Sequence, residues 1–273
     1  MKTRVLTAVV LLPLLLLVLL VAPKLVTAIL FGALCAVGAY ELLYNTGLVR
    51  HFRLVIYSMV MAFLVAIWSF LDAPHAWAMI GCLLFFVAVF AEMMASHVKL
   101  HFDKAAMCMA AGLLVPYLLC AVVRIHGMTS GRHMVLIPFI LSMCSDSGAY
   151  FAGKFLGRHK LAPVVSPNKT IEGVLGGLAA AVVGMLIYGL IMQLAMDYRV
   201  NYALAILYGF AGCLAGVFGD LCFSIIKRQT GIKDYGELIP GHGGILDRLD
   251  SMVLVAPLTE ALLILLPLAE EVW

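Results

Sequence analysis

The sequence predicts an all-α protein that crosses a membrane several times. Only 12% of its residues are charged, and its mean hydropathy is +1.08, which is far too apolar for a water-soluble domain of 273 residues. Apolar runs of about the 20 residues that an α-helix needs to cross a ~30 Å hydrocarbon core recur along the chain. These observations predict a polytopic integral membrane protein with nine transmembrane helices.

The nine predicted spans follow one another with short connections. They are Val5–Ala22, Leu25–Leu43, Leu54–Phe70, Trp77–Ala91, Ala105–Val123, Met134–Tyr150, Val174–Ala195, Tyr202–Ile226 and Leu249–Leu268. The first run also resembles a secretory signal, but it is longer than the usual ~7–15 apolar residues and a second span follows directly. We therefore expect it to be a retained helix.

Basic residues are distributed unevenly between the two sides that nine spans define. The amino terminus and the loops after even-numbered spans hold all the Lys and Arg residues except Lys24, Arg124, Arg132 and Arg199. The positive-inside rule therefore predicts a cytoplasmic amino terminus and cytoplasmic polar loops. The net charge of +3 is spread over short loops, which suits lipid head groups or phosphates and predicts no nucleic-acid partner. The seven cysteines lie in apolar runs without CxxC spacing, as expected of packing residues.

Polar residues divide the chain into two regions. Residues 1–132 are interpreted as a supporting region of amino-terminal transmembrane helices. Residues 133–273 are interpreted as a catalytic transmembrane region with two cytoplasmic polar loops. In the first region, Glu41 and Glu92 stand near the cytoplasmic ends of spans, where each can simply reach the interface, and neither is assigned a function.

Ser224–Asp250, SIIKRQTGIKDYGELIPGHGGILDRLD, is the charged segment around which the chain is organised. Its glycines at 241, 243 and 244 lack Cβ atoms, so backbone N–H groups can approach phosphate oxygens there. His242 is a candidate phosphate donor or general acid, and equally a residue that orders the turn. The candidate phosphate-binding cations are Lys227, Arg228, Lys233 and Arg248.

One helical face of the eighth span gives the best geometric indication of a site. Asp220, Ser224 and Lys227 stand at i, i+4 and i+7. Asp220 then lies roughly 10 Å deeper than Lys227, where a bare carboxylate costs at least about 2.5–3.5 kcal/mol. We therefore expect Asp220 to face a polar cavity or a bound cation. Asp247 and Asp250 can add carboxylates to that cavity, and oxygen ligands of this kind predict Mg²⁺ rather than zinc.

A second polar stretch follows the sixth span. Asp146 is expected to be buried among apolar neighbours, with basic residues nearby in the next loop. Ser166, before Pro167, is expected to cap the following helix, with Glu172 in its first turns, and such a helix start is also an anion site. Ser166 and Lys169 are therefore candidate substrate-binding residues. A solvated basic loop that only fixes topology is the alternative.

The patterns S-x-x-K-R, K-D-x-G and H-G-G-x-x-D-R-x-D in the charged segment resemble the phosphatidate cytidylyltransferase family, also called CDP-diacylglycerol synthase. The stretch SDSGAYFAGKFLGRHKLAPVVSPNKTIEGVLGG is similar to a second block of that family. The resemblance covers the carboxy-terminal half, whereas the first 130 residues match only as an apolar multi-span region. It implies a homodimeric enzyme of phospholipid biosynthesis in a bacterial-type plasma membrane. The implied reaction condenses CTP with phosphatidate to CDP-diacylglycerol and pyrophosphate.

The resemblance also implies dependence on Mg²⁺ and allows a monovalent cation such as K⁺ beside it. The metal ligands that we assign are Asp220 and Asp247, with Asp146 and Asp250 as weaker candidates. Ser224 and Ser166 are assigned to polar substrate groups or metal. Two alternatives stay open: the same chemistry on another lipid phosphate, and a cation-coupled transporter with mid-membrane carboxylates. The lack of an evident inverted repeat argues against the transporter.

Overall fold

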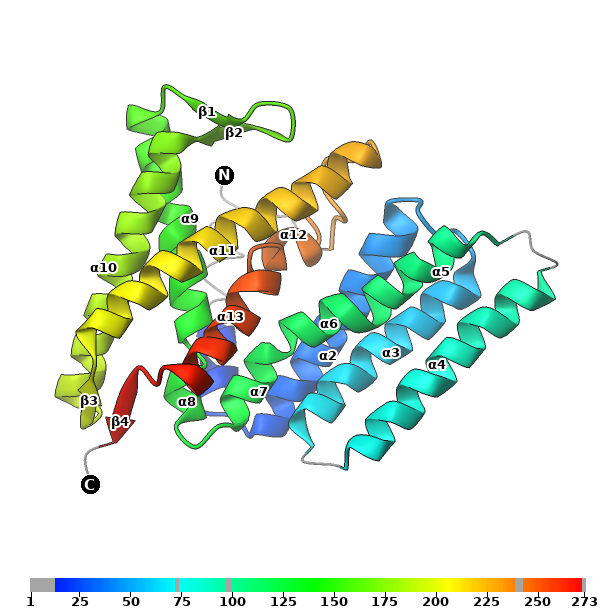
Figure 1. Cartoon of the computed structure of the whole chain (residues 1–273), viewed down its shortest axis with the longest axis horizontal. Helices are drawn as coiled ribbons and strands as arrows, with labels where there is room; N and C mark the ends of the chain where they lie inside the picture. The colour runs from blue at the N-terminus through cyan, green and yellow to red at the C-terminus, as the bar shows by residue number, and fades with distance from the viewer. Residues whose placement is uncertain (1–12, 72–73, 97–99, 239–242, 272–273) are drawn as a thin grey trace. The chain divides into compact units, whose positions relative to one another are not determined.

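The computed structural model describes residues 13–71, 74–96, 100–238 and 243–271, and most of these residues are helical (Figure 1). The all-α prediction is confirmed. The longer helices are α2 (Lys24–Tyr40), α3 (Phe52–Phe70), α4 (His75–Ala95), α9 (Ile137–Leu156), α10 (Ile171–Ala195), α11 (Tyr202–Gln229) and α13 (Met252–Leu265). The shorter elements are the π-helical turns η1 (Glu41–Asn45) and η2 (Ala110–Leu114), with α5 (Phe102–Met109), α6 (Val115–Leu119), α7 (Ala121–Gly127), α8 (Gly131–Met134) and α12 (Leu246–Leu249).

Seven helical segments among the described residues are long and apolar enough to cross a membrane, and they correspond to the second to eighth predicted spans. These segments identify the chain as an integral membrane protein. Residues 5–12 of the first predicted span, Val5–Ala22, lie outside the described residues. The ninth corresponds to α13, whose 14 residues reach about 21 Å and fall short of a ~30 Å hydrocarbon core.

The chain folds into two compact units. Unit 1 contains Met1–Arg132 and Lys227–Leu249, and unit 2 contains His133–Ile226 and Asp250–Trp273. In unit 1, α2 and α3 form the most extensive helix pair, and η2, α6 and α7 pack beside them. Most of the charged segment therefore belongs to the same unit as the amino-terminal helices.

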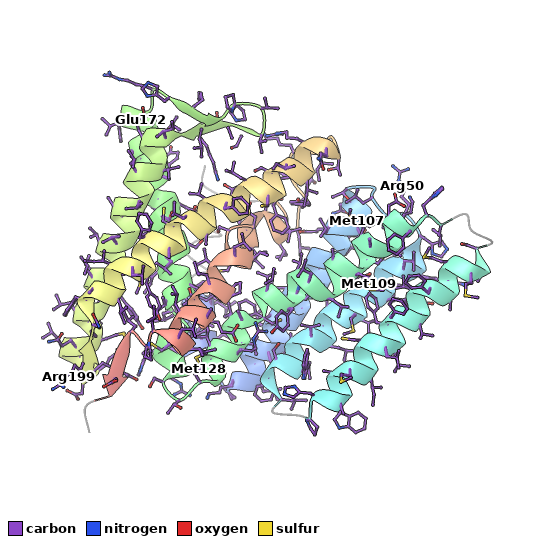
Figure 2. The ribbon with its side chains drawn as sticks, in the orientation of Figure 1. Arg50, Met107, Met109, Met128, Glu172 and Arg199 are labelled. Carbon is purple, nitrogen blue, oxygen red and sulfur yellow. The ribbon has the colours of Figure 1, made fainter. Side chains whose placement is uncertain are left out.

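Unit 2 is built on the pair α9 and α10, which pack along their lengths. The pair is close because glycines face it: a Cβ on Gly177 would stand 2.8 Å from the Ser145 carbonyl oxygen, and one on Gly176 would overlap the Ala152 side chain. In addition, strand β3 (Tyr198–Val200) pairs antiparallel with β4 (Ala269–Glu271). Figure 2 shows Glu172 and Arg199 near opposite ends of α10.

A hairpin joins α9 to α10, and the sequence interpretation did not include it. Strand β1 (Lys160–Ala162) pairs antiparallel with β2 (Ser166–Thr170). The expectation that Ser166 caps the helix is therefore wrong, because Ser166 begins a strand. The cap is Thr170, whose Oγ1 accepts the Gly173 N–H at 3.1 Å. Glu172, in the first turn of α10, connects the helix to the start of the hairpin, because its Oε1 accepts a hydrogen bond from His159 Nδ1 at 2.6 Å.

Candidate functional site

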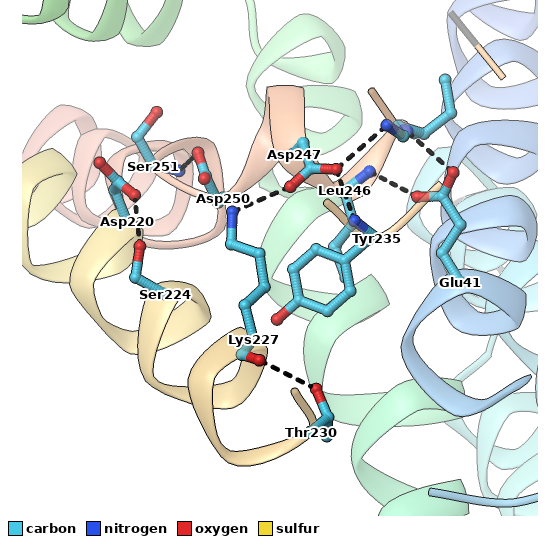
Figure 3. A network of polar contacts seen from close by, with 12 residues as sticks. Glu41, Asp220, Ser224, Lys227, Thr230, Tyr235, Leu246, Asp247, Asp250 and Ser251 are labelled. Carbon is cyan, nitrogen blue, oxygen red and sulfur yellow. Dashed lines mark hydrogen bonds and ion pairs between the residues drawn. The ribbon is translucent and has the colours of Figure 1, made fainter. Parts of the chain in front are cut away.

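Asp247 is the centre of a buried polar network in unit 1 (Figure 3). Its side chain is 3% exposed, and its Oδ1 accepts a hydrogen bond from Lys227 Nζ at 2.9 Å. Its Oδ2 accepts the backbone N–H groups of Tyr235 at 2.7 Å and Gly244 at 3.0 Å. The end of α11, the following loop and the start of α12 are thus connected through one carboxylate.

Lys227 reaches this carboxylate from the last turn of α11. Its Nζ also lies 5.4 Å from the centre of the fully buried Tyr235 ring, which is within cation–π range. A buried ion pair compensates for its desolvation only when its geometry is good and further hydrogen bonds satisfy the charges. The two backbone N–H groups that donate to Asp247 provide such bonds. Removing either Lys227 or Asp247 alone would therefore leave an uncompensated buried charge.

The described end of the glycine-rich segment, Gly243 and Gly244, contacts the same carboxylate. Gly243 has φ +85°, a left-handed conformation that favours glycine, and a Cβ there would stand 3.1 Å from Asp247 Oδ2. The Gly244 N–H, which the sequence suggested as a phosphate donor, is directed to Asp247. Gly241 and His242 lie outside the described residues.

Glu41 belongs to this network, although the sequence interpretation gave it no function. It is only 2% exposed, and its Oε1 and Oε2 accept the backbone N–H groups of Ile245 at 3.0 Å and Leu246 at 2.8 Å. The expectation that Glu41 simply reaches the interface is therefore wrong. Glu92, treated the same way in the sequence, instead pairs with the largely exposed Arg53 at 3.5 Å. In the sequence, both residues are carboxylates at the end of an apolar span, and this position alone does not distinguish Glu41 from Glu92.

Asp220 has a different environment, in unit 2. Its Oδ2 lies 2.7 Å from Lys169 Nζ, its Oδ1 accepts the Ser224 hydroxyl at 3.1 Å, and its side chain is 30% exposed. Lys169 Nζ also donates to the Val217 carbonyl oxygen at 3.3 Å. The helical face expected from the sequence is present, and the cation that faces Asp220 is a lysine from β2.

The residue before Asp220 fixes how α11 packs at this point. A Cβ on Gly219 would stand 2.8 Å from the Asp250 carbonyl oxygen, so the two backbones touch directly. Asp250 Oδ1 accepts the Ser251 N–H at 2.8 Å, and the Ser251 hydroxyl is hydrogen-bonded to that of Ser142 at 2.8 Å. Asp220 is thus held on a helix whose position within unit 2 is closely constrained.

The remaining predicted site residues are more accessible. Asp146 is exposed on α9, so the expectation that it is buried among apolar neighbours is wrong. Ser166 is half-buried in β2. The exposed cations of the charged segment are Arg228, Lys233 and Arg248.

Asp220 and Asp247 are the carboxylates that the sequence assigns to a divalent metal. Within the described ranges, no three His, Cys, Asp or Glu side chains come together as a metal-binding group. Proteins commonly hold Mg²⁺ through one or two carboxylates and leave the other positions to substrate phosphates and water. The oxygen chemistry of each carboxylate, Asp220 and Asp247, suits an ion held in that way. Both Asp247 oxygens already accept hydrogen bonds, from Lys227, Tyr235 and Gly244, so Asp220 is the more accessible ligand.

Comparison with known proteins places the chain in a family context. The model of the cytidylyltransferase family matches residues 2–266. A phosphatidate cytidylyltransferase of Staphylococcus haemolyticus is 45% identical over 136 residues, which cover 50% of this chain and 51% of that protein. The Staphylococcus aureus protein of the same name is 46% identical over equal shares. In these alignments the chain spans about half the length of the relatives. The Staphylococcus epidermidis protein is 34% identical over 269 residues, covering 97% and 99% of the two chains.

Proposed function

The chain belongs to the cytidylyltransferase family, and from this premise we propose that it is a phosphatidate cytidylyltransferase. A phosphate oxygen of phosphatidate forms a bond to the α-phosphorus of CTP. The bond from that phosphorus to the oxygen bridging to the β-phosphate breaks, and its electron pair leaves with pyrophosphate. The observation that carries the proposal is the charged segment, in which Lys227, Asp247 and Gly244 form one preorganised network.

The cations of the charged segment divide into two kinds. Lys227 is held in place by Asp247 and Tyr235, so it presents a fixed point charge. Arg228, Lys233 and Arg248 are exposed and accessible to a triphosphate from solution. Phosphoryl transfer needs positioning and charge neutralisation more than covalent chemistry. We therefore assign phosphate binding to these four cations, and His242 remains a candidate donor to the leaving group.

Mg²⁺ is the cofactor that we propose, held by Asp220 and Asp247 together with substrate phosphates. When bound, the ion neutralises phosphate charge and polarises the phosphorus–oxygen bonds. Asp250 and the exposed Asp146 are lesser candidates, and a monovalent cation such as K⁺ is a further expectation from the family resemblance. Ser224 orients Asp220 through its hydroxyl, and Lys169 balances the charge of Asp220.

The orientation and assembly are also proposals. We propose nine spans with the amino terminus and the site facing the cytoplasm of a bacterial-type plasma membrane, and a homodimeric assembly. The uneven distribution of basic residues supports this orientation. A reporter inserted near Lys233 is expected inside the cell and one fused after Trp273 outside. Both reporters on one side would contradict the count of nine spans.

The direct test is turnover by the purified protein in detergent, with labelled CTP and phosphatidate and no membrane gradient. We expect labelled CDP-diacylglycerol and an equal amount of pyrophosphate. If the protein turned over CTP only with another lipid phosphate, such as an isoprenoid ether lipid phosphate, cytidylyl transfer would stand, but phosphatidate would be the wrong acceptor. Failure to consume CTP with any lipid phosphate would overturn the proposed function.

A further inference from the structure

Glu41 connects the amino-terminal helices to the backbone of the charged segment. Its two oxygens accept the N–H groups of consecutive residues, Ile245 and Leu246, at 3.0 and 2.8 Å. Hydrogen bonds to a charged acceptor are about twice as strong as neutral ones. Because these residues directly precede Asp247, the contact fixes the peptide planes 244–245 and 245–246, which lead into Asp247.

A second side chain of η1 contacts the charged segment at Tyr235. Asn45 Nδ2 donates to the Tyr235 carbonyl oxygen at 2.7 Å, while the Tyr235 N–H donates to Asp247. Glu41 and Asn45 are the first and last residues of the π-helical turn η1. Isolated π-helical turns are rare and frequently occur at functional sites. One turn of an amino-terminal helix therefore holds both backbone stretches that meet at Asp247.

The charged segment closes tightly on the Glu41 carboxylate. A Cβ added to Gly236 would stand 2.5 Å from Glu41 Oε1, and a Cβ on Gly244 would stand 2.6 Å from both Glu41 oxygens. Real Cβ atoms do not approach oxygens so closely, so any larger residue at 236 or 244 requires Glu41 to move. The glycines that flank the loop thus serve the contact with Glu41 as well as the turn itself.

We propose that Glu41 is a positioning residue for cytidylyl transfer. It acts through the backbone of residues 245–246 and sets the position of Asp247, and with it the Lys227 charge. The inference rests on the proposed function, because its kinetic consequence exists only if the protein turns over CTP. Its structural consequence, a fixed backbone at 245–246, can be measured independently.

The first experiment compares Glu41→Gln with Glu92→Gln as the matched control. Glutamine keeps the size of the side chain but turns an –NH₂ donor towards one of the two N–H groups. We expect the kcat of Glu41→Gln to fall about 10- to 100-fold, as for the loss of a charged hydrogen-bond partner. The control changes a carboxylate that pairs with His51 and Arg53, away from the charged segment, and its kcat should stay within about twofold of wild type.

Hydrogen exchange by mass spectrometry separates a local effect from general unfolding. In Glu41→Gln, peptides covering residues 243–249 should exchange faster, while those from α4 and α10 keep the wild-type rate. Unchanged exchange at 243–249, or equal acceleration everywhere, would overturn the proposal. This readout needs no turnover. An inactive wild type with faster local exchange in Glu41→Gln would refute the proposed function and the kinetic role, while leaving the contact itself established.

A glycine pair tests the same contact without altering the carboxylate. Gly236→Ala places a methyl group against Glu41 Oε1, whereas a Cβ on Gly38 would lie 3.7 Å from Leu246 Cδ1, an ordinary contact. Gly236→Ala should lower kcat about 10-fold or more, and Gly38→Ala should leave it unchanged. Combining Gly236→Ala with Glu41→Gln should be less than additive, because both act on one contact. Strict additivity, or full activity of Gly236→Ala, would overturn the proposal.

Discussion

The two carboxylates that the sequence assigns to the metal, one in each unit, are paired in similar ways and buried to very different degrees. Asp247 and Asp220 each bind a lysine, at 2.9 and 2.7 Å respectively. Asp247 is 3% exposed and takes two further backbone hydrogen bonds, whereas Asp220 is 30% exposed and takes one from Ser224. The difference indicates two tasks: Asp247 organises the charged segment, and Asp220 is accessible to a ligand.

The energetics of ion pairs support this division. Removing one partner of a buried pair leaves an uncompensated charge and costs about 3–5 kcal/mol, whereas an exposed pair contributes about 0–1 kcal/mol. The Lys169 and Asp220 side chains are 22% and 30% exposed, so separating them should cost less than separating Lys227 from Asp247, and another cation can then take the place of Lys169. Lys227 cannot leave Asp247 so readily. The comparison predicts which variants lose stability together with activity and which lose activity alone.

The largest effect is expected for Asp247→Asn. The neutral amide cannot compensate the Lys227 charge. Its –NH₂ group would also face one of the three groups that now donate hydrogen bonds to Asp247, so both turnover and stability should fall. We expect turnover to drop at least about 100-fold and the free energy of unfolding to fall by about 3 kcal/mol. Turnover and thermal unfolding in detergent measure the two losses. Full stability of this variant would show that Asp247 does not organise the segment.

An exchange of cations should have the next largest effect. Lys227→Arg keeps the charge, but the larger planar group needs a different geometry beside Asp247 and the buried Tyr235 ring, so we expect turnover to fall about 10-fold or more. Arg53→Lys is the control, because the Arg53 side chain is 73% exposed. Equal turnover of the two variants at equal membrane abundance would show that Lys227 only fixes the topology of its helix and does not bind phosphate.

A packing variant beside Asp220 should have the smallest effect. Gly219→Ala places a methyl group 2.8 Å from the Asp250 carbonyl oxygen and should destabilise the protein by about 1–3 kcal/mol. Gly81→Ala in α4 meets no atom within 4 Å and should be neutral or stabilising by up to about 1 kcal/mol. Thermal unfolding compares the two. If the variants had the same midpoint, α11 would not be constrained at Gly219.

Local patterns were sufficient to predict several features. Composition and apolar runs predicted an all-α membrane protein and the spans that the structure describes. Helical periodicity predicted that Asp220 and Ser224 share a face, and their hydrogen bond confirms it. The motifs of the charged segment predicted the family. Each of these features depends on residues close together in the chain, where spacing and chemistry can be read directly.

Long-range contacts were not predictable in the same way. Glu41 binds a residue 204 positions away, and nothing in its own neighbourhood distinguishes it from Glu92. Asp146 was expected to be buried because its span is apolar, but burial depends on which helices pack against that face. The β1–β2 hairpin arises where a polar loop pairs with itself, and the Ser-Pro sequence alone suggested a helix cap instead.

The most direct test of the proposed division is Asp220→Asn, with turnover and thermal unfolding measured on the same purified sample. Because Asp220 and Lys169 are less buried than Asp247 and Lys227, the unfolding midpoint should stay much closer to that of wild type than the midpoint of Asp247→Asn does. Turnover of labelled CTP should fall at least about 100-fold, because the carboxylate proposed to bind the metal has lost its charge. Near-normal turnover, or a loss of stability as large as that of Asp247→Asn, would contradict the account.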